Sequence, residues 1–247
     1  MGVAADRSAL PAGAAGLVFA GEMYALQLDQ LAVLLATGRR GATSLAARWR
    51  AAGLAESGQL SLGPRWVWLT RAGLASAGLP YTATAPGLSR LAHLRAVTAA
   101  RLALSAVPGF AAGGGYWRGE RRLRARMGGR TGLREHVPDG EVHWAGGTAA
   151  PWAGECWAIE AELTPKTPAR TIAIMRELLH RTGDYGCLAA DAAVPGRPPR
   201  HDRAVYLCSP AARPLVSRAR QGLGPRAGRV EIRLRPPGAT LGDAIWP

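Results

Sequence analysis

The sequence has no asparagine, few phenylalanine or isoleucine residues, and one lysine, Lys166, among its 31 basic residues. This bias indicates GC-rich coding, in which lysine codons drift to arginine wherever the protein tolerates the exchange. A surviving lysine can therefore mark a place where arginine will not do, because an ammonium is a compact point charge and a guanidinium is a planar fork. The alternative is that Lys166 is simply a remnant of the drift.

Cysteine is scarce as well. The chain has three cysteines, Cys156, Cys187 and Cys208, and they are widely spaced. An odd number at such spacing predicts buried small hydrophobic residues in a reducing cytoplasm rather than a disulfide framework. The five histidines lack the close pairing that zinc ligands have, which argues against a zinc site.

Long apolar runs are absent, because Arg, Gly or Pro interrupts each one, so we expect no membrane span and no membrane partner. The N-terminus also lacks the pattern of a signal peptide, and we expect a cytoplasmic protein. What the chain does have is a formal charge of +14 over 247 residues. Exchange of lysine for arginine leaves charge unchanged, so coding bias does not explain the excess. A polyanion, above all DNA, is the expected partner.

Residues 1–80 read as a compact helical unit with a hairpin. Apolar spacing and capping residues predict a first helix over 16–23, a second over 27–36, a turn at 38–41, a third helix from Thr43 or Ser44 to Ala52, strands at 59–62 and 65–69, and a helix over 71–77 capped by Thr70. This order is that of a winged helix-turn-helix. A major-groove helix needs small residues and arginines on its outward face.

The residues expected to contact DNA in this unit are Arg39, Arg40, Ser44, Arg48, Arg50 and Arg65. The alternative is that the winged helix serves protein interaction or is purely structural. The positive net charge favours DNA.

Residues 81–115 are expected to form a linker and a bridging helix, the helix over 88–107. Residues 116–247 read as an α/β domain. The expected elements are a helix over 116–127, strands at 141–144 and 157–163, a helix from 167 or 168 to 181, a strand over 203–208, a helix over 211–221 and a strand over 230–234. The fold class is therefore α/β, or α+β for the whole chain.

The expected helix over 116–127 is dense in arginine. Arg118, Arg121 and Arg122 are the candidates for contact with the DNA backbone, and Glu120 is a candidate catalytic residue on the same helix. The alternative is an ordinary solvated face, since charge runs are usually that.

Asp139, Glu160, Glu162 and Lys166 fall at the ends of two neighbouring predicted strands. Phosphodiester hydrolysis uses such residues, because carboxylates hold Mg²⁺ and a lysine positions water or stabilises negative charge. We take these four as candidate catalytic residues, with Asp139 and Glu160 as the metal ligands and Mg²⁺ as the cofactor. The alternative is a pair of exposed strand-end glutamates that balance nearby arginines.

The order of these residues resembles that of the PD-(D/E)xK nuclease superfamily: a helix with Glu120, then Pro138-Asp139, then a strand carboxylate, then a lysine. One departure stands out. In that superfamily the lysine normally follows the carboxylate by two positions, where this chain has Glu162, and Lys166 comes four residues later beyond Pro165.

The chain as a whole resembles the replication-relaxation family of actinobacterial plasmids and integrative elements. The resemblance rests on five short motifs: Leu69-Thr-Arg-Ala-Gly73, Leu91-Ala-His93, Trp117-Arg-Gly-Glu120-Arg-Arg, Pro138-Asp139-Gly140 and Ile159-Glu160-Ala-Glu162. It implies a role in the replication or topological state of mobile DNA, with either a metal-dependent endonuclease or nickase or a non-enzymatic regulator whose nuclease fold is degenerate. A homodimer is a further expectation.

Overall fold

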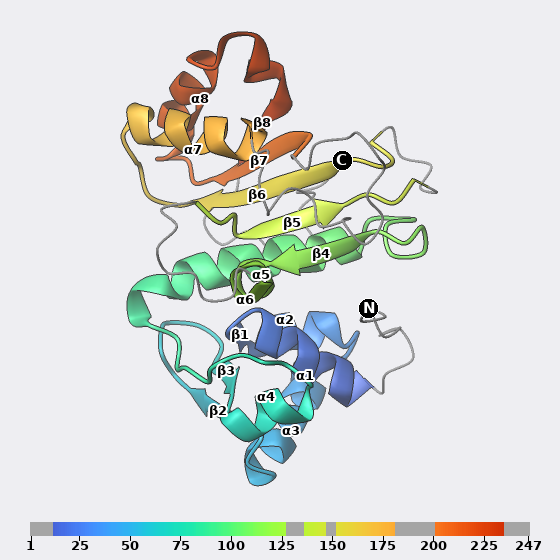
Figure 1. Ribbon diagram of the computed structural model, residues 1–247. Helices are drawn as coiled ribbons and strands as arrows, with labels where there is room; N and C mark the ends of the chain where they lie inside the picture. Colours follow the sequence, from blue (N-terminus) through green and yellow to red (C-terminus); the bar gives the residue numbers. More distant parts are fainter. Residues whose placement is uncertain (1–11, 127–135, 147–151, 181–200, 235–247) are drawn as a thin grey trace. The chain divides into compact units, whose positions relative to one another are not determined.

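The computed structural model describes residues 12–126, 136–146, 152–180 and 201–234 (Figure 1). The chain divides into two compact units, residues 1–102 and 103–247. The division falls inside the expected bridging helix rather than at either end of it. In the described ranges, no helix is both long and apolar enough to cross a membrane.

Unit 1 contains five α-helices, one 3-10 helix and a three-stranded antiparallel sheet in its described part. The elements are α1 (Ala12–Glu22), β1 (Leu26–Gln27), α2 (Leu28–Leu34), α3 (Arg39–Ala51), β2 (Ala55–Gly58), β3 (Trp66–Leu69), α4 (Arg71–Ser76), the 3-10 helix η2 (Leu88–Arg90) and α5 (Leu91–Ser105), whose last turn belongs to unit 2. The strand order is β1-β3-β2. The expected series of three helices, a hairpin and a further helix is present, with β1 as an additional strand.

Helix α3 starts earlier than its sequence indicated. Gly38 is its N-cap, so Arg39, Arg40 and Gly41 lie in the first turn and not in a separate turn. The prediction favoured Thr43 or Ser44 as a cap because their hydroxyls can cap a helix, but the Thr43 hydroxyl instead donates to the Arg39 carbonyl. The buried side of α3 consists of Ala42, Ala46 and Trp49.

The hairpin is also displaced in sequence relative to expectation. Strand β2 covers Ala55–Gly58, and the segment 59–62 that was predicted as a strand lies in the connection to β3. The pairing register sets Ala55 opposite Leu69 and Gly58 opposite Trp66. The apolar residues of 59–62 suggested a strand. Instead, the Gln59 side-chain amide donates hydrogen bonds to the carbonyls of Ser61 and Gly63, which stabilises a local turn.

The start of α4 is fixed by Thr70, as predicted. The Thr70 hydroxyl accepts a hydrogen bond from the Gly73 amide and donates one to the Gly53 carbonyl. The Thr70 amide donates to the Leu54 carbonyl. A Cβ at Gly73 would lie 1.9 Å from that same Leu54 oxygen. The glycine of the Leu69-Thr-Arg-Ala-Gly73 motif is therefore required by close packing of two backbone segments.

We predict that Gly73→Ala lowers the stability of unit 1 by about 2 kcal/mol or more, because the obstructing atom is backbone and cannot rotate away. Urea unfolding followed by tryptophan fluorescence measures the change. Gly87→Ala is the matched control, because a Cβ at Gly87 meets no atom within 4 Å. Equal stability of the two variants would contradict this explanation of the motif.

Helix α5 is joined to the rest of unit 1 by ion pairs and a hydrogen bond. Arg95 pairs with Asp29 at 2.7 Å, and Arg101 pairs with Glu22 at 2.6 Å. The Gln30 side-chain amide donates to the Arg95 carbonyl. Because Arg101 and Glu22 are both largely buried, this pair fixes the helix more firmly than a surface ion pair would.

Unit 2 is built on one mixed sheet with the strand order β4-β5-β6-β7-β8. Its elements are β4 (Tyr116–Gly119), α6 (Glu120–Arg126), β5 (Gly140–His143), β6 (Cys156–Glu162), α7 (Pro168–His180), β7 (Arg203–Cys208), α8 (Arg213–Gln221), the 3-10 helix η4 (Gly224–Arg229) and β8 (Val230–Leu234). Strands β4 to β6 are antiparallel, and β6 to β8 are parallel. The mixed α/β fold class predicted from sequence is confirmed.

The predicted helix over 116–127 is half wrong, since its first four residues form β4. Trp117 in β4 packs over Gly140 so closely that a Cβ there would lie 2.1 Å from the Trp117 ring. Arginine density suggested one helix, but pairing of Tyr116–Gly119 with β5 decides the conformation.

The sheet of unit 2 has two different faces. Helices α7 and α8 cover one face, where Ala158, Tyr206 and Cys208 pack against Met175 and Val216 (Figure 1). The side chains of Trp144 and Trp157 belong to the opposite face, and they form an aromatic cluster with Trp152 and Phe110. The polar residues described next lie on the face of Ala158.

Candidate functional site

Strand β6 is buried along its whole length, although it contains two glutamates. Glu160 and Glu162 are each 4% exposed and share a face of the sheet with Ala158. The expectation that both point to one face is confirmed. The alternative of exposed strand-end carboxylates is wrong, because the helical layer covers them. Buried carboxylates need partners, and each has one.

Glu160 is held by a histidine from the segment before β5. The His136 Nε2 atom lies 2.7 Å from Glu160 Oε1, and the His136 backbone amide donates to Glu177 on α7. Asp139, three residues on, accepts a hydrogen bond from the Ala161 amide at 2.8 Å. The antiparallel register of β5 and β6 thus brings Asp139 beside the segment of Glu160.

Lys166 lies next to Glu162. Its Nζ atom is 2.6 Å from Glu162 Oε2, and its side chain is 32% exposed. The lysine follows the strand instead of lying within it. Its ammonium nevertheless reaches back to the end of the strand and pairs with the Glu162 carboxylate.

These groups perturb one another. Burial raises the pKa of Glu160 to about 7, and the charge of Asp139 adds to this, while His136 and Lys166 oppose it. Burial lowers the pKa of His136, but the hydrogen bond to Glu160 and the charges of Glu160 and Asp139 outweigh it, so the net shift is upward. Tyr206, paired in register with Glu160, has its pKa raised by burial and by the carboxylates. Asp139, Glu160 and Lys166 therefore belong to one electrostatic cluster.

The donor types at this cluster fit Mg²⁺. Magnesium is typically bound by one or two carboxylates together with water and substrate phosphate, and Asp139 and Glu160 supply two. Glu160 with a pKa near 7 can exchange its proton for a cation close to neutral pH. Lys166 supplies positive charge beside these carboxylates, and the His136 ring lies within hydrogen-bond distance of Glu160.

A second buried cluster lies on the same two strands. His201 Nε2 is 2.9 Å and His143 Nε2 is 3.4 Å from the two oxygens of Glu141, and His201 Nδ1 lies 3.0 Å from the Leu178 carbonyl. Burial disfavours the charge on Glu141, but the two histidines outweigh it and lower its pKa to about 2. Burial lowers the pKa of His143 despite the neighbouring carboxylate.

This second cluster includes a possible set of metal ligands: Glu141, Cys156 and His201. Among the described residues, this is the one group of three His, Cys, Asp or Glu side chains whose ligand atoms all lie within 4.8 Å of one another. Cys156, however, is disulfide-bonded, so its sulfur is not available as a thiolate ligand. The expectation of three reduced cysteines is thus wrong for Cys156. Cys208 is buried and free, and Cys187 lies outside the described residues.

The remaining candidates of unit 2 lie apart from these carboxylates or are buried. The Glu120 backbone amide donates to the Asp139 carbonyl, but its carboxylate pairs with Arg124 at 2.8 Å. Arg118 and Arg121 are only 6% and 8% exposed, so neither side chain lies on the surface of the described structure, where contact with DNA phosphate was expected. Arg122 is half-buried.

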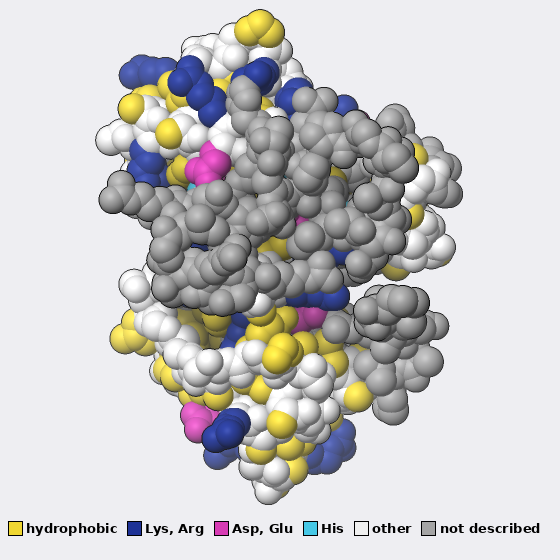
Figure 2. Space-filling model, viewed as in Figure 1, with side chains coloured by type: hydrophobic (Ala, Val, Ile, Leu, Met, Phe, Trp, Pro, Cys, Tyr) yellow, Lys and Arg dark blue, Asp and Glu magenta, His cyan; other side chains and the backbone are white. Residues whose placement is uncertain are grey.

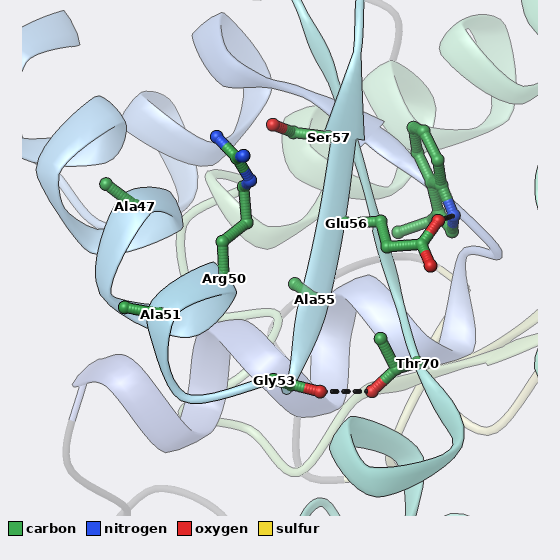
Figure 3. A pocket seen from close by; sticks show the side chains of 9 residues that line it. Ala47, Arg50, Ala51, Gly53, Ala55, Glu56, Ser57 and Thr70 are labelled. Atoms are coloured by element: carbon green, nitrogen blue, oxygen red, sulfur yellow. Dashed lines mark hydrogen bonds between the residues drawn. The ribbon is translucent and has the colours of Figure 1, made fainter.

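Unit 1 does present its predicted DNA-binding residues. Arg39, Arg40, Ser44, Arg48 and Arg50 are exposed on α3, and Arg65 is exposed in the connection between β2 and β3. Beside α3 lies an open groove of about 680 Å³. Figure 3 shows Arg50 extending from α3 along β2 toward Ser57, with Ala47 and Ala51 on the helix beside it. Two of the residues that line the groove are joined by a hydrogen bond, which the Thr70 hydroxyl donates to the Gly53 carbonyl.

Sequence reasoning missed His136, His143 and His201. Each is an isolated histidine in the chain, and their partners Glu160 and Glu141 lie 24, 2 and 60 residues away. The alternation of Glu141 and His143 on a strand was the one local signal, since it places both on one face.

Comparison with protein-family models gives no match to the chain, and comparison with curated proteins gives none either. The class that the structure itself defines is a two-unit α/β protein with a buried carboxylate cluster in its second unit.

We predict that the free energy of unfolding of Glu160→Gln, relative to that of wild type, increases as the pH rises. A carboxyl group with a raised folded-state pKa contributes stability that is full below its unfolded pKa of about 4.5 and is lost as the pH rises through 7. From pH 5 to pH 8 the variant should gain roughly 1 to 3 kcal/mol over wild type. Urea unfolding at several pH values measures this. Glu120→Gln, at a partly exposed ion pair, is the control and should show no such gain; a flat difference for Glu160→Gln would refute the assignment.

Proposed function

We propose that this protein binds double-stranded DNA, with α3 of unit 1 as the recognition helix, and serves the replication or topological state of a mobile element in the cytoplasm. The observation that supports the DNA-binding part is the division of α3 into two sides. Its inner side consists of Ala42, Ala46 and Trp49, and its outer side has only small or basic residues. The mobile-element role rests on the resemblance to the replication-relaxation family.

The composition of the outer side suits close approach to DNA. At helical spacing, Arg40, Ser44, Ala47, Arg48 and Ala51 share one exposed strip of α3. Small side chains let the helix backbone enter the major groove, and arginines at its edges reach phosphates or guanine. Neither Asp nor Glu occurs in α3. Arg39 and Arg40 in the first turn add positive charge where the helix dipole is already positive, which favours an anion there.

We predict that Arg48→Ala weakens DNA binding and flattens its salt dependence. Each lost phosphate contact reduces the slope of log K against log salt concentration by about 0.9. Fluorescence anisotropy with a labelled duplex of mixed sequence at several NaCl concentrations measures the slope. Arg71→Ala on α4 is the matched control, because Arg71 is also an exposed helical arginine. Equal effects of the two substitutions, or wild-type affinity that is indifferent to salt, would contradict the role of α3.

For unit 2 we propose a Mg²⁺-dependent phosphodiester site, an endonuclease or nickase, at Asp139, Glu160 and Lys166. When bound, the metal ion would lower the pKa of a water molecule and neutralise charge on the phosphate. Asp139 and Glu160 would hold it. Lys166 would leave Glu162 to contact the phosphate or the attacking water, and His136 would lose its hydrogen bond with Glu160 when that carboxylate holds the cation. The electrostatic coupling of these four groups supports this proposal.

A second candidate is a regulator or replication accessory in which the nuclease-like site is degenerate. One observation favours it: every carboxylate of the cluster already has a partner inside the protein, namely His136 for Glu160, the Ala161 amide for Asp139 and Lys166 for Glu162. A site closed in this way binds a cation only if the cation displaces these partners.

The two candidates are separated by incubating supercoiled plasmid with the protein and Mg²⁺ or Mn²⁺ and following nicked and linear products on gels. The enzyme predicts cleavage by wild type and a loss of at least a hundredfold in Asp139→Ala and Lys166→Ala. Lys166→Arg is the informative control, because it keeps the charge but not the point-like ammonium. Binding without cleavage by wild type on any DNA topology would establish the degenerate site.

A further inference from the structure

The outer surface of α7, α8 and η4 in unit 2 is basic. These three elements contain seven arginines and a single acid, Glu177. Five of the arginines are exposed, namely Arg170, Arg176, Arg213, Arg218 and Arg226, and we call these five the α7/α8 arginine surface. Figure 2 shows basic side chains gathered over α7 and α8. This enrichment exceeds that of the whole chain, which has 31 basic and 17 acidic residues.

Acidic residues do not neutralise this surface within the described part of the chain. Glu177 is half-buried and its carboxylate accepts a hydrogen bond from the His136 amide. Neither α7 nor α8 has an acid in its first turn, where acids would favour the helix dipole. Arg170 and Arg213 lie in those first turns instead, an arrangement that costs helix stability and concentrates positive potential.

The exposed arginines differ from their neighbours in having few contacts. Arg220 donates to the Ala227 carbonyl, and Arg229 donates to the carbonyls of His201 and Asp202, so these two serve the packing of α8 and η4. Of the five surface arginines, only Arg176 has a side-chain hydrogen bond in the described structure, a long one of 3.5 Å to the Gly222 carbonyl. Packing therefore does not explain why the other four are arginines.

The surface adjoins the carboxylate cluster. Helix α7 begins two residues after Lys166, and α8 follows the end of β7, so the first turns of both helices lie at the carboxyl edge of the parallel strands. In open α/β sheets, ligands bind at that edge. Arg170 and Arg213 thus belong to the same edge as Glu162 and Lys166.

We propose that the α7/α8 arginine surface is a second DNA-binding surface, which grips the phosphate backbone of double-stranded DNA next to the carboxylate cluster. It replaces Arg118 and Arg121, whose side chains are buried, as the phosphate-binding part of unit 2. This inference rests on the proposed function in taking DNA as the partner. Helix α7 has 13 residues and is about 20 Å long, which corresponds to about six base pairs of duplex.

The test uses the full-length protein and three variants on a labelled 30-base-pair duplex of mixed sequence, with anisotropy measured from low to physiological NaCl. The first variant is Arg170→Ala/Arg218→Ala/Arg226→Ala, and its matched control replaces the same three residues by lysine, which retains the charge. The third variant, Arg40→Ala/Arg48→Ala, removes charge from α3 alone. Thermal unfolding verifies that the variants remain folded, as expected for exposed positions.

The proposal predicts that the triple alanine variant flattens the salt slope by about 2 to 3 and weakens binding at 0.1 M salt at least tenfold, while the triple lysine variant retains the wild-type slope. A wild-type slope in the triple alanine variant, with binding reduced in the α3 variant, would overturn the second surface and leave the proposed function intact. A flattened slope in both triple variants would overturn the charge-based contact. Absence of DNA binding by wild type would overturn both proposals.

Discussion

The fold of unit 2 depends on the hydrogen bonds and ion pairs that compensate three carboxylates buried on one face of its sheet. Glu141, Glu160 and Glu162 are each at most 4% exposed, and removing a carboxylate from water is costly unless a partner compensates. Each carboxylate has a partner from outside the two strands: His201, which precedes β7, for Glu141; His136, which precedes β5, for Glu160; and Lys166, which follows β6, for Glu162. His136, Lys166 and His201 are thereby held against the sheet, and Asp139, three residues after His136, lies beside the segment of Glu160.

A purely structural protein gains little from such an arrangement, because apolar side chains of similar volume would fill the same space without a desolvation cost. Glu141 with its two histidines is consistent with structural use, since its pKa of about 2 keeps it ionised. Glu160 differs, because burial raises its pKa to about 7. Ionising Glu160 at neutral pH therefore costs folding free energy. Perturbed groups of this kind concentrate at functional sites. The contrast between the two glutamates is the physical basis for placing the reactive site at Glu160.

Much of this could be predicted from the sequence. The strands over 203–208 and 230–234 were predicted with correct bounds, and alternation along β6 placed Glu160 and Glu162 on one face. Local signals failed where tertiary pairing decides the structure, as for Tyr116–Gly119, which joins the sheet although the residues that follow it are helical. Burial was also misjudged. A run of arginines suggested an exposed surface, but Arg118 lies in the edge strand β4 and its side chain is buried. Histidine partners 24 and 60 residues away have no local signature at all.

The central claim is that the cluster of Asp139, Glu160 and Lys166 is a cation site that its own partners hold closed. The most direct measurement is calorimetric titration of the full-length protein with Mn²⁺ at pH 6.5, in two buffers of different ionisation enthalpy, which counts the protons released. The account predicts one tight site, release of about one proton because Glu160 must ionise, and loss of both signals in Glu160→Gln. No Mn²⁺ binding by wild type, or binding that Glu160→Gln leaves unchanged, would contradict it.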